Sequence, residues 1–176
     1  SNNGVAYILF KDQGGVNNWG QVKKIAALDA GANDNFGMSI AMAGTNVLVG
    51  APMHDEETGS PTVDNGAAYV FSQNAGGLNN WGQVAKLLAT DRASTDQLGG
   101  SVALYSNTAV VGAKQTDSGA QTNNGAAYIF DGSSAWSQAT KLLATAPVSL
   151  INDNFGQSVG VGSAGVIIGS YRDDIG

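Results

Sequence analysis

Four short segments that recur in the same order constrain the fold of this chain more than any other feature. The first segment begins at a tryptophan and occurs three times, at Trp19, Trp81 and Trp136. The second segment contains Phe-Gly or Leu-Gly, at Phe36-Gly37, Leu98-Gly99 and Phe155-Gly156. The third segment ends near another glycine, which is Gly50, Gly112 or Gly169 in the same order. In every copy the Phe or Leu and the later glycine are 14 positions apart. This constant spacing predicts that the second and third segments form a fixed hairpin.

The fourth segment shows that the repeat continues across the two ends of the chain. It reads Gly66-Ala67-Ala68-Tyr69-Val70-Phe71, it returns from Gly125 to Phe130, and its third copy begins at Gly4. We interpret residues 1–176 as one array of three repeats, which cover 19–80, 81–135, and 136–176 together with 1–18. The third unit is therefore divided between the N-terminal and C-terminal parts of the chain.

The segments have the composition of β-strands. They are four to eight residues long, they are rich in Val, Ile, Tyr, Phe and Ala, and Gly, Asn, Asp or Ser separates them. The segment at each tryptophan also carries long polar side chains such as Gln21 and Lys23, so we expect it to be the outermost, half-solvated strand. The predicted class is all-β: a β-propeller of four-stranded antiparallel blades, with three blades' worth of strands and one blade split between the termini.

Phe36-Gly37 together with Gly50-Ala51-Pro52 resembles the pair of motifs that names the FG-GAP repeats of integrin α-subunit-like propellers and bacterial surface proteins. The second copy, Leu98-Gly99 with Gly112-Ala113-Lys114, is a degenerate version of the same pair. The resemblance extends over the entire chain. It implies a β-propeller that is secreted or on the cell surface, of bacterial type, and that takes part in adhesion or ligand recognition through loops on one face.

The chain departs from the family at its calcium site. Many integrin-type repeats carry a D-x-D-x-D-G-like loop between the two motifs, but the corresponding segments 42–46, 104–108 and 161–165 contain no carboxylate. We therefore predict no cofactor, with a weak calcium or other cation site in the acidic loop 53–64 as the alternative. Each repeat also has an aspartate two residues before its Phe or Leu, and we expect these to cap tight turns: Asp34, Asp96 and Asp153.

The predicted ligand-binding residues lie in loops that vary between repeats while the framework repeats. Two such loops cover 52–65 and 114–124, and a third lies near the C-terminus. The candidates are His54, Asp55, Glu56, Glu57, Asp64, Gln115, Asp117, Tyr171, Arg172 and Asp173. The alternative interpretation of the acidic stretches is that they are simply solvated loops.

The three repeat-equivalent tryptophans predict packing between blades, with stacking on a sugar ring as the alternative. Tyr105 and Tyr171 stand outside the repeated positions and are candidates for surface contacts.

Charge and composition exclude several classes of partner and chemistry. The net charge of −6 disfavours nucleic acid and anionic membranes. The chain has no cysteine, which excludes disulfides and thiol catalysis, and no apolar run long enough to insert into a membrane. No Ser-His-Asp arrangement, phosphate loop or His-rich metal motif occurs, so we predict that the protein is not an enzyme. The start at Ser1 fits a processed chain or a fragment.

Three blades are too few for a closed propeller, which uses four to eight. We expect a homo-oligomer, a head-to-tail dimer that closes six blades; the alternatives are a longer propeller chain that supplies the remaining blades and an open filament. The expected function is a non-enzymatic extracellular or cell-surface module that binds a protein or glycan. A structural subunit of a surface layer or fibre and a propeller lectin are the alternatives, and an enzyme ranks last.

Overall fold

A computed structural model describes residues 3–56, 63–117, 122–145 and 151–173. Within these residues the chain forms twelve strands and one short 3-10 helix, Gly132–Ser134. The strands are β1 (Ala6–Lys11), β2 (Trp19–Ile25), β3 (Ser39–Ala43), β4 (Asn46–Ala51), β5 (Ala67–Ser72), β6 (Gly82–Leu87), β7 (Ser101–Tyr105), β8 (Thr108–Ala113), β9 (Ala126–Asp131), β10 (Ser137–Leu142), β11 (Ser158–Gly162) and β12 (Gly165–Gly169). The predicted all-β class is confirmed.

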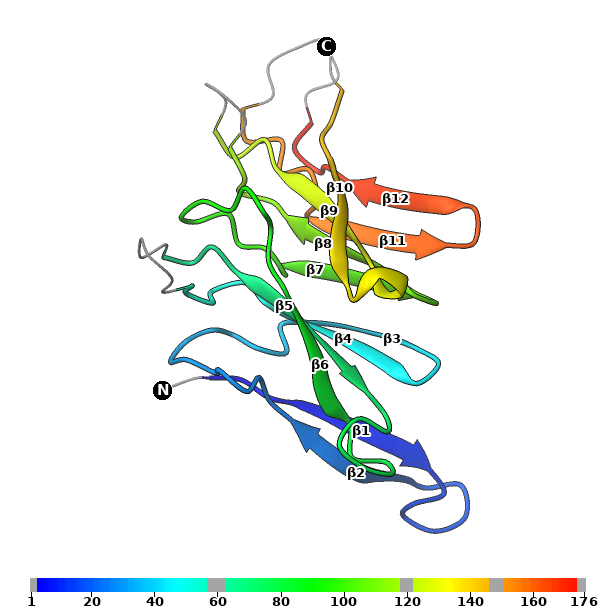
Figure 1. The fold of residues 1–176 in the computed structure, drawn as a ribbon. Helices are drawn as coiled ribbons and strands as arrows, with labels where there is room; N and C mark the ends of the chain where they lie inside the picture. Colours follow the sequence, from blue (N-terminus) through cyan, green and yellow to red (C-terminus); the bar gives the residue numbers. More distant parts are fainter. Residues whose placement is uncertain (1–2, 57–62, 118–121, 146–150, 174–176) are drawn as a thin grey trace.

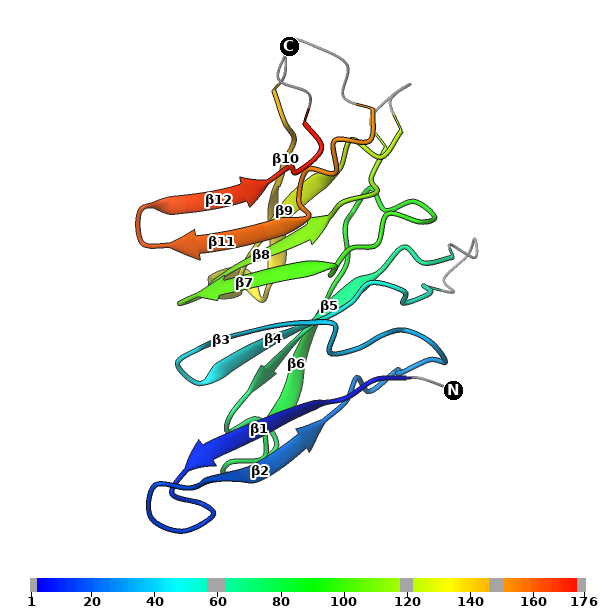
Figure 2. The ribbon, with the colours of Figure 1, turned by 180° about the vertical axis from the view of Figure 1, so that it is seen from behind.

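The strands form antiparallel sheets that follow one another in chain order (Figures 1 and 2). Two sheets have four strands, in the orders β3-β4-β5-β6 and β7-β8-β9-β10. A two-stranded sheet flanks them at each end: the N-terminal hairpin β1-β2 and the C-terminal hairpin β11-β12. This architecture is consistent with propeller blades, in which each four-stranded sheet is one blade.

The hairpin predicted from the constant glycine spacing is present in each repeat. β3 pairs with β4 so that Ser39 lies opposite Gly50, and β7 pairs with β8 so that Ser101 lies opposite Gly112. The strand that follows each tryptophan lies at a sheet edge, as the polar side chains predicted. It pairs with the strand before it, so β6 completes the sheet of β3, β4 and β5.

The central strands of the two full sheets are buried on both faces. Every residue of β4 after Asn46 is buried, and β8 has the same pattern after Thr108. Leu48 belongs to the core shared with the following sheet, whereas Val49 belongs to the core shared with the preceding hairpin. A strand pressed between two neighbouring sheets needs apolar side chains at consecutive positions, which explains the short runs of Val, Leu and Ala.

The repeated glycines lie where one sheet meets the next. A Cβ atom at Gly50 would collide with the carbonyl oxygen of Gly99, and one at Gly112 would collide with that of Gly156. The same carbonyl groups accept hydrogen bonds of 2.7 Å from the hydroxyls of Ser39 and Ser101. The glycine of the Phe-Gly motif in one sheet therefore contacts the glycine of the third segment in the preceding sheet.

The tryptophans occupy three different environments. Trp81 is 2% exposed and its ring meets the ring of Phe10 edge-on, at a centroid distance of 6.2 Å. Trp136 is partly buried against the core between the two full sheets, but Trp19 is 67% exposed. The packing interpretation is confirmed for Trp81, because its ring lies between β1 of the N-terminal hairpin and its own sheet.

Candidate ligand-binding site

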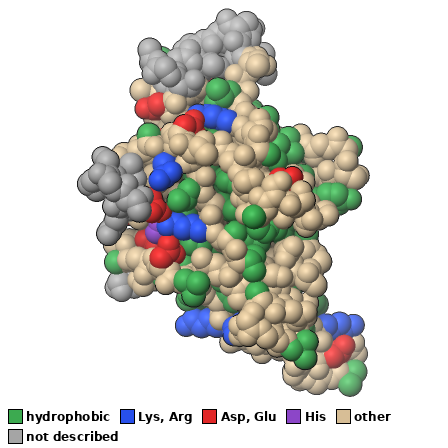
Figure 3. All heavy atoms as spheres, viewed as in Figure 1, with side chains coloured by type: hydrophobic (Ala, Val, Ile, Leu, Met, Phe, Trp, Pro, Cys, Tyr) green, Lys and Arg blue, Asp and Glu red, His purple; other side chains and the backbone are tan. Residues whose placement is uncertain are grey.

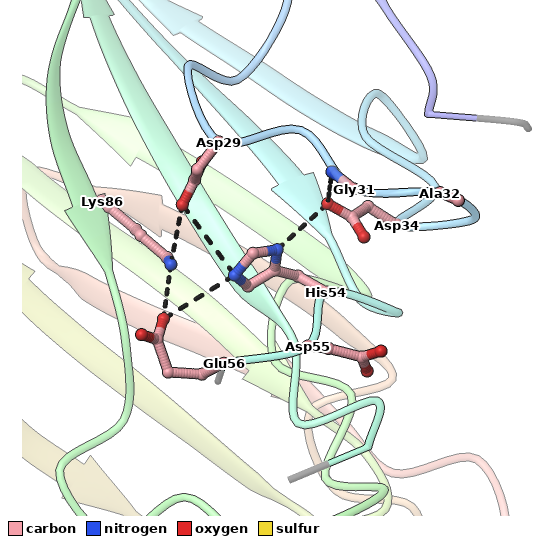
Figure 4. A pocket seen from close by; sticks show the side chains of 8 residues that line it. All are labelled: Asp29, Gly31, Ala32, Asp34, His54, Asp55, Glu56 and Lys86. Atoms are coloured by element: carbon pink, nitrogen blue, oxygen red, sulfur yellow. Dashed lines mark hydrogen bonds and ion pairs between the residues drawn. The ribbon is translucent and has the colours of Figure 1, made fainter. Parts of the chain in front are cut away.

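A cavity of about 490 Å³ opens between the segment that follows β2 and the segment that follows β4. Charged side chains and one histidine gather on this edge of the molecule (Figure 3). Figure 4 shows the residues that line the cavity: Asp29, Gly31, Ala32, Asp34, His54, Asp55, Glu56 and Lys86. The cavity has a volume typical of small-molecule sites, but its lining is largely polar.

Lys86 lies at the centre of the charged cluster. Its Nζ is 2.8 Å from Oδ2 of Asp29 and 2.5 Å from Oε2 of Glu56. Burial alone would raise the pKa of Asp29, but the hydrogen bond and charge of Lys86 outweigh it, so this pKa lies below its ordinary value. Burial likewise opposes the charge of Lys86, and the two carboxylates reverse that effect and raise the pKa of its ammonium. Both groups are therefore held in their charged forms.

His54 is buried and has a fixed orientation in the wall of the cavity. A hydrogen bond of 3.0 Å joins its Nδ1 to Oδ2 of Asp34, and the other ring nitrogen, Nε2, is 3.7 Å from Oε2 of Glu56 and 4.0 Å from Oδ2 of Asp29. The edge of the imidazole also packs against Tyr69, at 6.1 Å between ring centroids. The ring therefore turns Nε2 toward the carboxylates around Lys86 (Figure 4).

Part of this arrangement belongs to the repeat framework. The same contacts occur one repeat later, where Lys141 pairs with Asp91 at 2.6 Å and the hydroxyl of Tyr128 donates a 3.0 Å hydrogen bond to the same aspartate. Burial raises the pKa values of both Tyr69 and Tyr128, and Asp29 or Asp91 adds to the effect. An Asp, a Lys and a Tyr thus recur together between successive sheets.

His54 and Glu56 distinguish the first copy from the second. Counting from Ala51 and Ala113, the residue equivalent to His54 is Thr116, and the sequence has Ser118 at the position of Glu56. Both loops begin with the same turn, since His54 N–H donates to the carbonyl of Ala51 and Thr116 N–H donates to that of Ala113. The cavity therefore combines repeated residues with two that are specific to one loop.

The structure gathers only some of the sequence-predicted residues around this cavity. His54, Asp55 and Glu56 line it, while Asp64 is half-buried and its N–H donates to Asp55. Glu57 lies outside the described residues.

The other predicted residues do not line this cavity. Gln115 is half-buried, and the exposed Asp117 accepts a hydrogen bond from the N–H of Asn123. Near the C-terminus, the guanidinium of Arg172 lies over the ring of Tyr171 and Asp173 is exposed. The predicted residues thus belong to three separate loops.

Sequence reasoning missed Asp29 and Lys86 as lining residues. Each has an in-phase partner one repeat later, Asp91 and Lys141 respectively, at the same distance from the preceding repeated tryptophan. This recurrence at equal spacing could have identified the two residues from the sequence. Asp34 was expected to cap a turn, and it does accept a 2.8 Å hydrogen bond from the N–H of Gly31; Asp96 does the same for Ala93 at 2.7 Å.

Among the described residues, no group of three or more acidic or histidine side chains is arranged to hold a metal ion. In the cavity itself, the ammonium of Lys86 occupies the position between Asp29 and Glu56 that a cation would take. The expectations about calcium and cofactors stay predictions.

Comparison with known proteins identifies the family. A family model of the FG-GAP repeat matches residues 19–71 and 81–130, together more than half of the chain. The chain belongs to the FG-GAP repeat family. Both matched segments begin at a repeated tryptophan and end in the Tyr-Val-Phe or Tyr-Ile-Phe strand, as the repeat read from the sequence does. No curated protein matches the chain. Within the described residues no helix is long and apolar enough to cross a membrane.

Proposed function

We propose that this FG-GAP protein is a non-enzymatic extracellular or cell-surface module, of bacterial origin, that binds a protein or glycan ligand through the loops around His54. Repeats of this family are typical of extracellular proteins. In this proposal each four-stranded sheet is a propeller blade, and β1-β2 and β11-β12 are the two halves of a split blade. The observation that carries the proposal is the cavity in which His54 and Glu56 depart from an otherwise repeated framework.

The lining of the cavity favours a ligand that offers hydrogen-bond donors or a positive charge. Three carboxylates, those of Asp29, Asp34 and Glu56, lie within 4.0 Å of the lysine or the histidine. Asp55 also lines the cavity, but its side chain points away from both (Figure 4). Amine, guanidinium and sugar hydroxyl groups all donate hydrogen bonds to carboxylates. A basic side chain of a protein ligand and a hydroxyl-rich glycan are the two chemistries that fit.

The same electrostatics argue against catalysis in this cavity. A general acid or base works best with a pKa near the working pH. Lys86 and Asp29 shift each other's pKa away from neutral pH. The pKa of the Asp29 carboxyl lies below its ordinary value, and that of the Lys86 ammonium lies above it. The pair is suited to holding charge in place rather than to transferring a proton.

Binding to a glycan array and to a panel of extracellular matrix proteins tests the proposal. The informative variant is His54→Thr with Glu56→Ser, because it installs the residues that the second repeat carries on an equivalent loop. We expect the wild type to bind at least one member of a panel and the double variant to lose that binding at least tenfold. Asp131→Asn, a change at the end of β9 that does not line the cavity, should retain it. Wild-type protein that binds nothing in either panel, or a double variant that binds as well as the wild type, contradicts the proposal.

A structural subunit of a surface layer or fibre is the second candidate, favoured by the low share of charged residues, 12%. Negative-stain microscopy separates the two roles, since a fibre subunit forms extended arrays and a binding module forms discrete particles. The lectin alternative is a narrower form of the main proposal, and the glycan array tests it directly.

A further inference from the structure

The acidic residues around Lys86 and His54 already have partners within the chain. Nζ of Lys86 lies 2.8 Å from Oδ2 of Asp29 and 2.5 Å from Oε2 of Glu56, so one ammonium pairs with two carboxylates. Oδ2 of Asp34 accepts hydrogen bonds from a backbone N–H and from the ring of His54. A cationic ligand would have to compete with these partners, and it would meet the positive charge of Lys86 at close range.

One buried nitrogen in the wall of the cavity lacks a hydrogen-bond partner. Among the described side chains that line the cavity, this atom is Nε2 of His54. Nδ1 of the same ring faces the carboxylate of Asp34, which can only accept, so Nδ1 carries the proton and Nε2 of the neutral ring offers a lone pair. Oε2 of Glu56 and Oδ2 of Asp29 face Nε2 at 3.7 and 4.0 Å, and they are acceptors as well. A buried acceptor among other acceptors requires a donor, and a ligand can supply it.

Lys86 supplies the complementary half of the site. An ammonium has three N–H donors, and the two carboxylates beside Lys86 take two of them. Nζ of Lys86 and Nε2 of His54 both lie within 4.0 Å of the same two oxygens, Oδ2 of Asp29 and Oε2 of Glu56 (Figure 4). The third donor and the lone pair therefore face one small space. Asp29 and Lys86 form its solvent side, since their side chains are 42% and 22% exposed, and the flexible stem of the lysine can move with a ligand.

Few ligand groups can use a donor and an acceptor at once. A hydroxyl does so, because its oxygen accepts and its hydrogen donates. Ammonium and guanidinium groups only donate, so they would leave the third N–H of Lys86 without a partner and would add a like charge beside it. A carboxylate or phosphate group only accepts, and the charges of Asp29 and Glu56 would repel it. The hydroxyl is the group that fits this space.

We propose that the cavity binds an uncharged, hydroxyl-rich carbohydrate, with one sugar hydroxyl that accepts a hydrogen bond from Lys86 and donates one to Nε2 of His54. This inference rests on the proposed function, that the cavity around His54 binds a ligand, and it selects a glycan over the basic side chain of a protein. Lys86 determines the specificity, because it fills the position of a cation and presents a donor to a neutral ligand. The equivalent pair of Lys141 and Asp91 lacks the acceptor nitrogen, since Thr116 stands in place of His54.

Replacement of Lys86 by glutamine distinguishes the two ligand chemistries by the sign of its effect. The amide keeps two N–H donors for Asp29 and Glu56, but it has neither the third donor nor the charge. For an uncharged glycan selected on a glycan array, Lys86→Gln should weaken binding at least about tenfold, the usual effect of losing one hydrogen bond to a charged group. A cationic ligand should instead bind Lys86→Gln more tightly than the wild type, because the cavity becomes more negative.

Lys141→Gln is the matched control. It removes the same kind of contact between sheets, since Lys141 pairs with Asp91 at 2.6 Å, but Lys141 does not line the cavity. Its thermal stability should fall as that of Lys86→Gln does, while its affinity for the glycan should equal that of the wild type. An equal loss of binding in the two variants would assign the effect to folding and overturn the proposal.

Analogues of the selected glycan locate the hydroxyl. Each monodeoxy form lacks one hydroxyl, and one of these forms should bind the wild type at least about tenfold more weakly than the parent glycan. The same form should show little further loss in Lys86→Gln, because the two changes remove one contact. An analogue with an amine at that carbon should bind the wild type more weakly than the parent glycan, and Lys86→Gln should reduce or reverse this preference.

The results distinguish the choice of ligand from the function on which it rests. A wild type that binds only proteins or amine-bearing glycans, with higher affinity in Lys86→Gln, overturns the carbohydrate assignment and leaves the ligand-binding function intact. An uncharged glycan that binds Lys86→Gln as well as the wild type overturns the role of Lys86. A wild type that binds nothing in either panel contradicts the ligand-binding function and, with it, this inference.

Discussion

Asp29 and Asp96 show how the surroundings of one carboxylate decide what it contributes to folding. Asp29 faces the ammonium of Lys86, and its pKa lies below the ordinary value despite partial burial. Asp96 is buried under a turn, and burial raises its pKa although the N–H of Ala93 donates to it. The same residue type is therefore stabilised in its charged form at one position and disfavoured in that form at the other.

The two aspartates should respond to pH with opposite signs. A lowered folded-state pKa means that Asp29 contributes stability above its unfolded pKa of about 4, and that this contribution is lost as the pH falls through the folded value. A raised pKa means that the contribution of Asp96 is complete below about pH 4 and is lost as the pH rises through its folded value. Relative to the wild type, Asp29→Asn should therefore lose stability at pH 7 and recover at pH 3, whereas Asp96→Asn should gain between pH 3 and pH 7.

Urea denaturation of the wild type and both variants at pH 3 and pH 7 measures these differences. Asparagine keeps an oxygen that can accept the Ala93 hydrogen bond, so the comparison at Asp96 isolates the charge. Equal pH dependence in the two variants would contradict the assigned environments.

The role of a single residue could be predicted where it depends only on residues nearby in the sequence. The turn-capping role of Asp34 and Asp96 follows from their place before a tight turn, and the structure confirms it. The grouping of Asp29 with Lys86 and Glu56 could not be predicted in the same way, because it depends on how two sheets meet. His54 and Glu56 were identified only as members of a variable loop.

At the scale of the strands, the contacts between sheets explain why glycine recurs in the repeated motifs. The glycine of the Phe-Gly motif and the glycine of the third segment meet across neighbouring sheets, where no Cβ atom fits. Sequence comparison within the chain located both glycines and the hairpin between them. Sequence comparison could not assign where one sheet ends and the next begins, because the repeat unit can be counted from any of its four segments. The pairing of β6 with β5 shows that the strand after the tryptophan completes the preceding sheet.

Gly112→Ala should therefore loosen the contact between two sheets. Its new methyl group would collide with the backbone of Gly156, in the turn before β11, and with the hydroxyl of Ser101 at the start of β7. Overpacking of this kind costs about 1–3 kcal/mol. Gly100→Ala is the control, since the nearest atom to its Cβ would be 3.5 Å away, in ordinary van der Waals contact. The midpoint of urea denaturation should fall for Gly112→Ala alone, and an equal fall in both variants would show that glycine is needed for a reason other than this contact.

At the scale of the whole molecule, the array buries each full sheet against its neighbours through two cores. One core joins the N-terminal hairpin to the first full sheet and includes Ile8, Val49 and Trp81. The other joins the two full sheets and includes Leu48 and Tyr128. Leu48 and Val49 are consecutive residues of β4, so one strand contributes to both cores. A repeat array is stabilised by such contacts between nearest neighbours.

Trp81 joins the first full sheet to the N-terminal hairpin, so its side chain should contribute to the stability of the whole array. Trp81 is 2% exposed and its ring meets that of Phe10 edge-on, whereas its repeat equivalent Trp19 is 67% exposed. Replacing a buried tryptophan by alanine costs about 3–5 kcal/mol. Trp81→Ala should therefore lower the midpoint of urea denaturation, and Trp19→Ala, the matched control, should leave it nearly unchanged. An equal fall in the two variants would contradict the environments assigned to the two tryptophans.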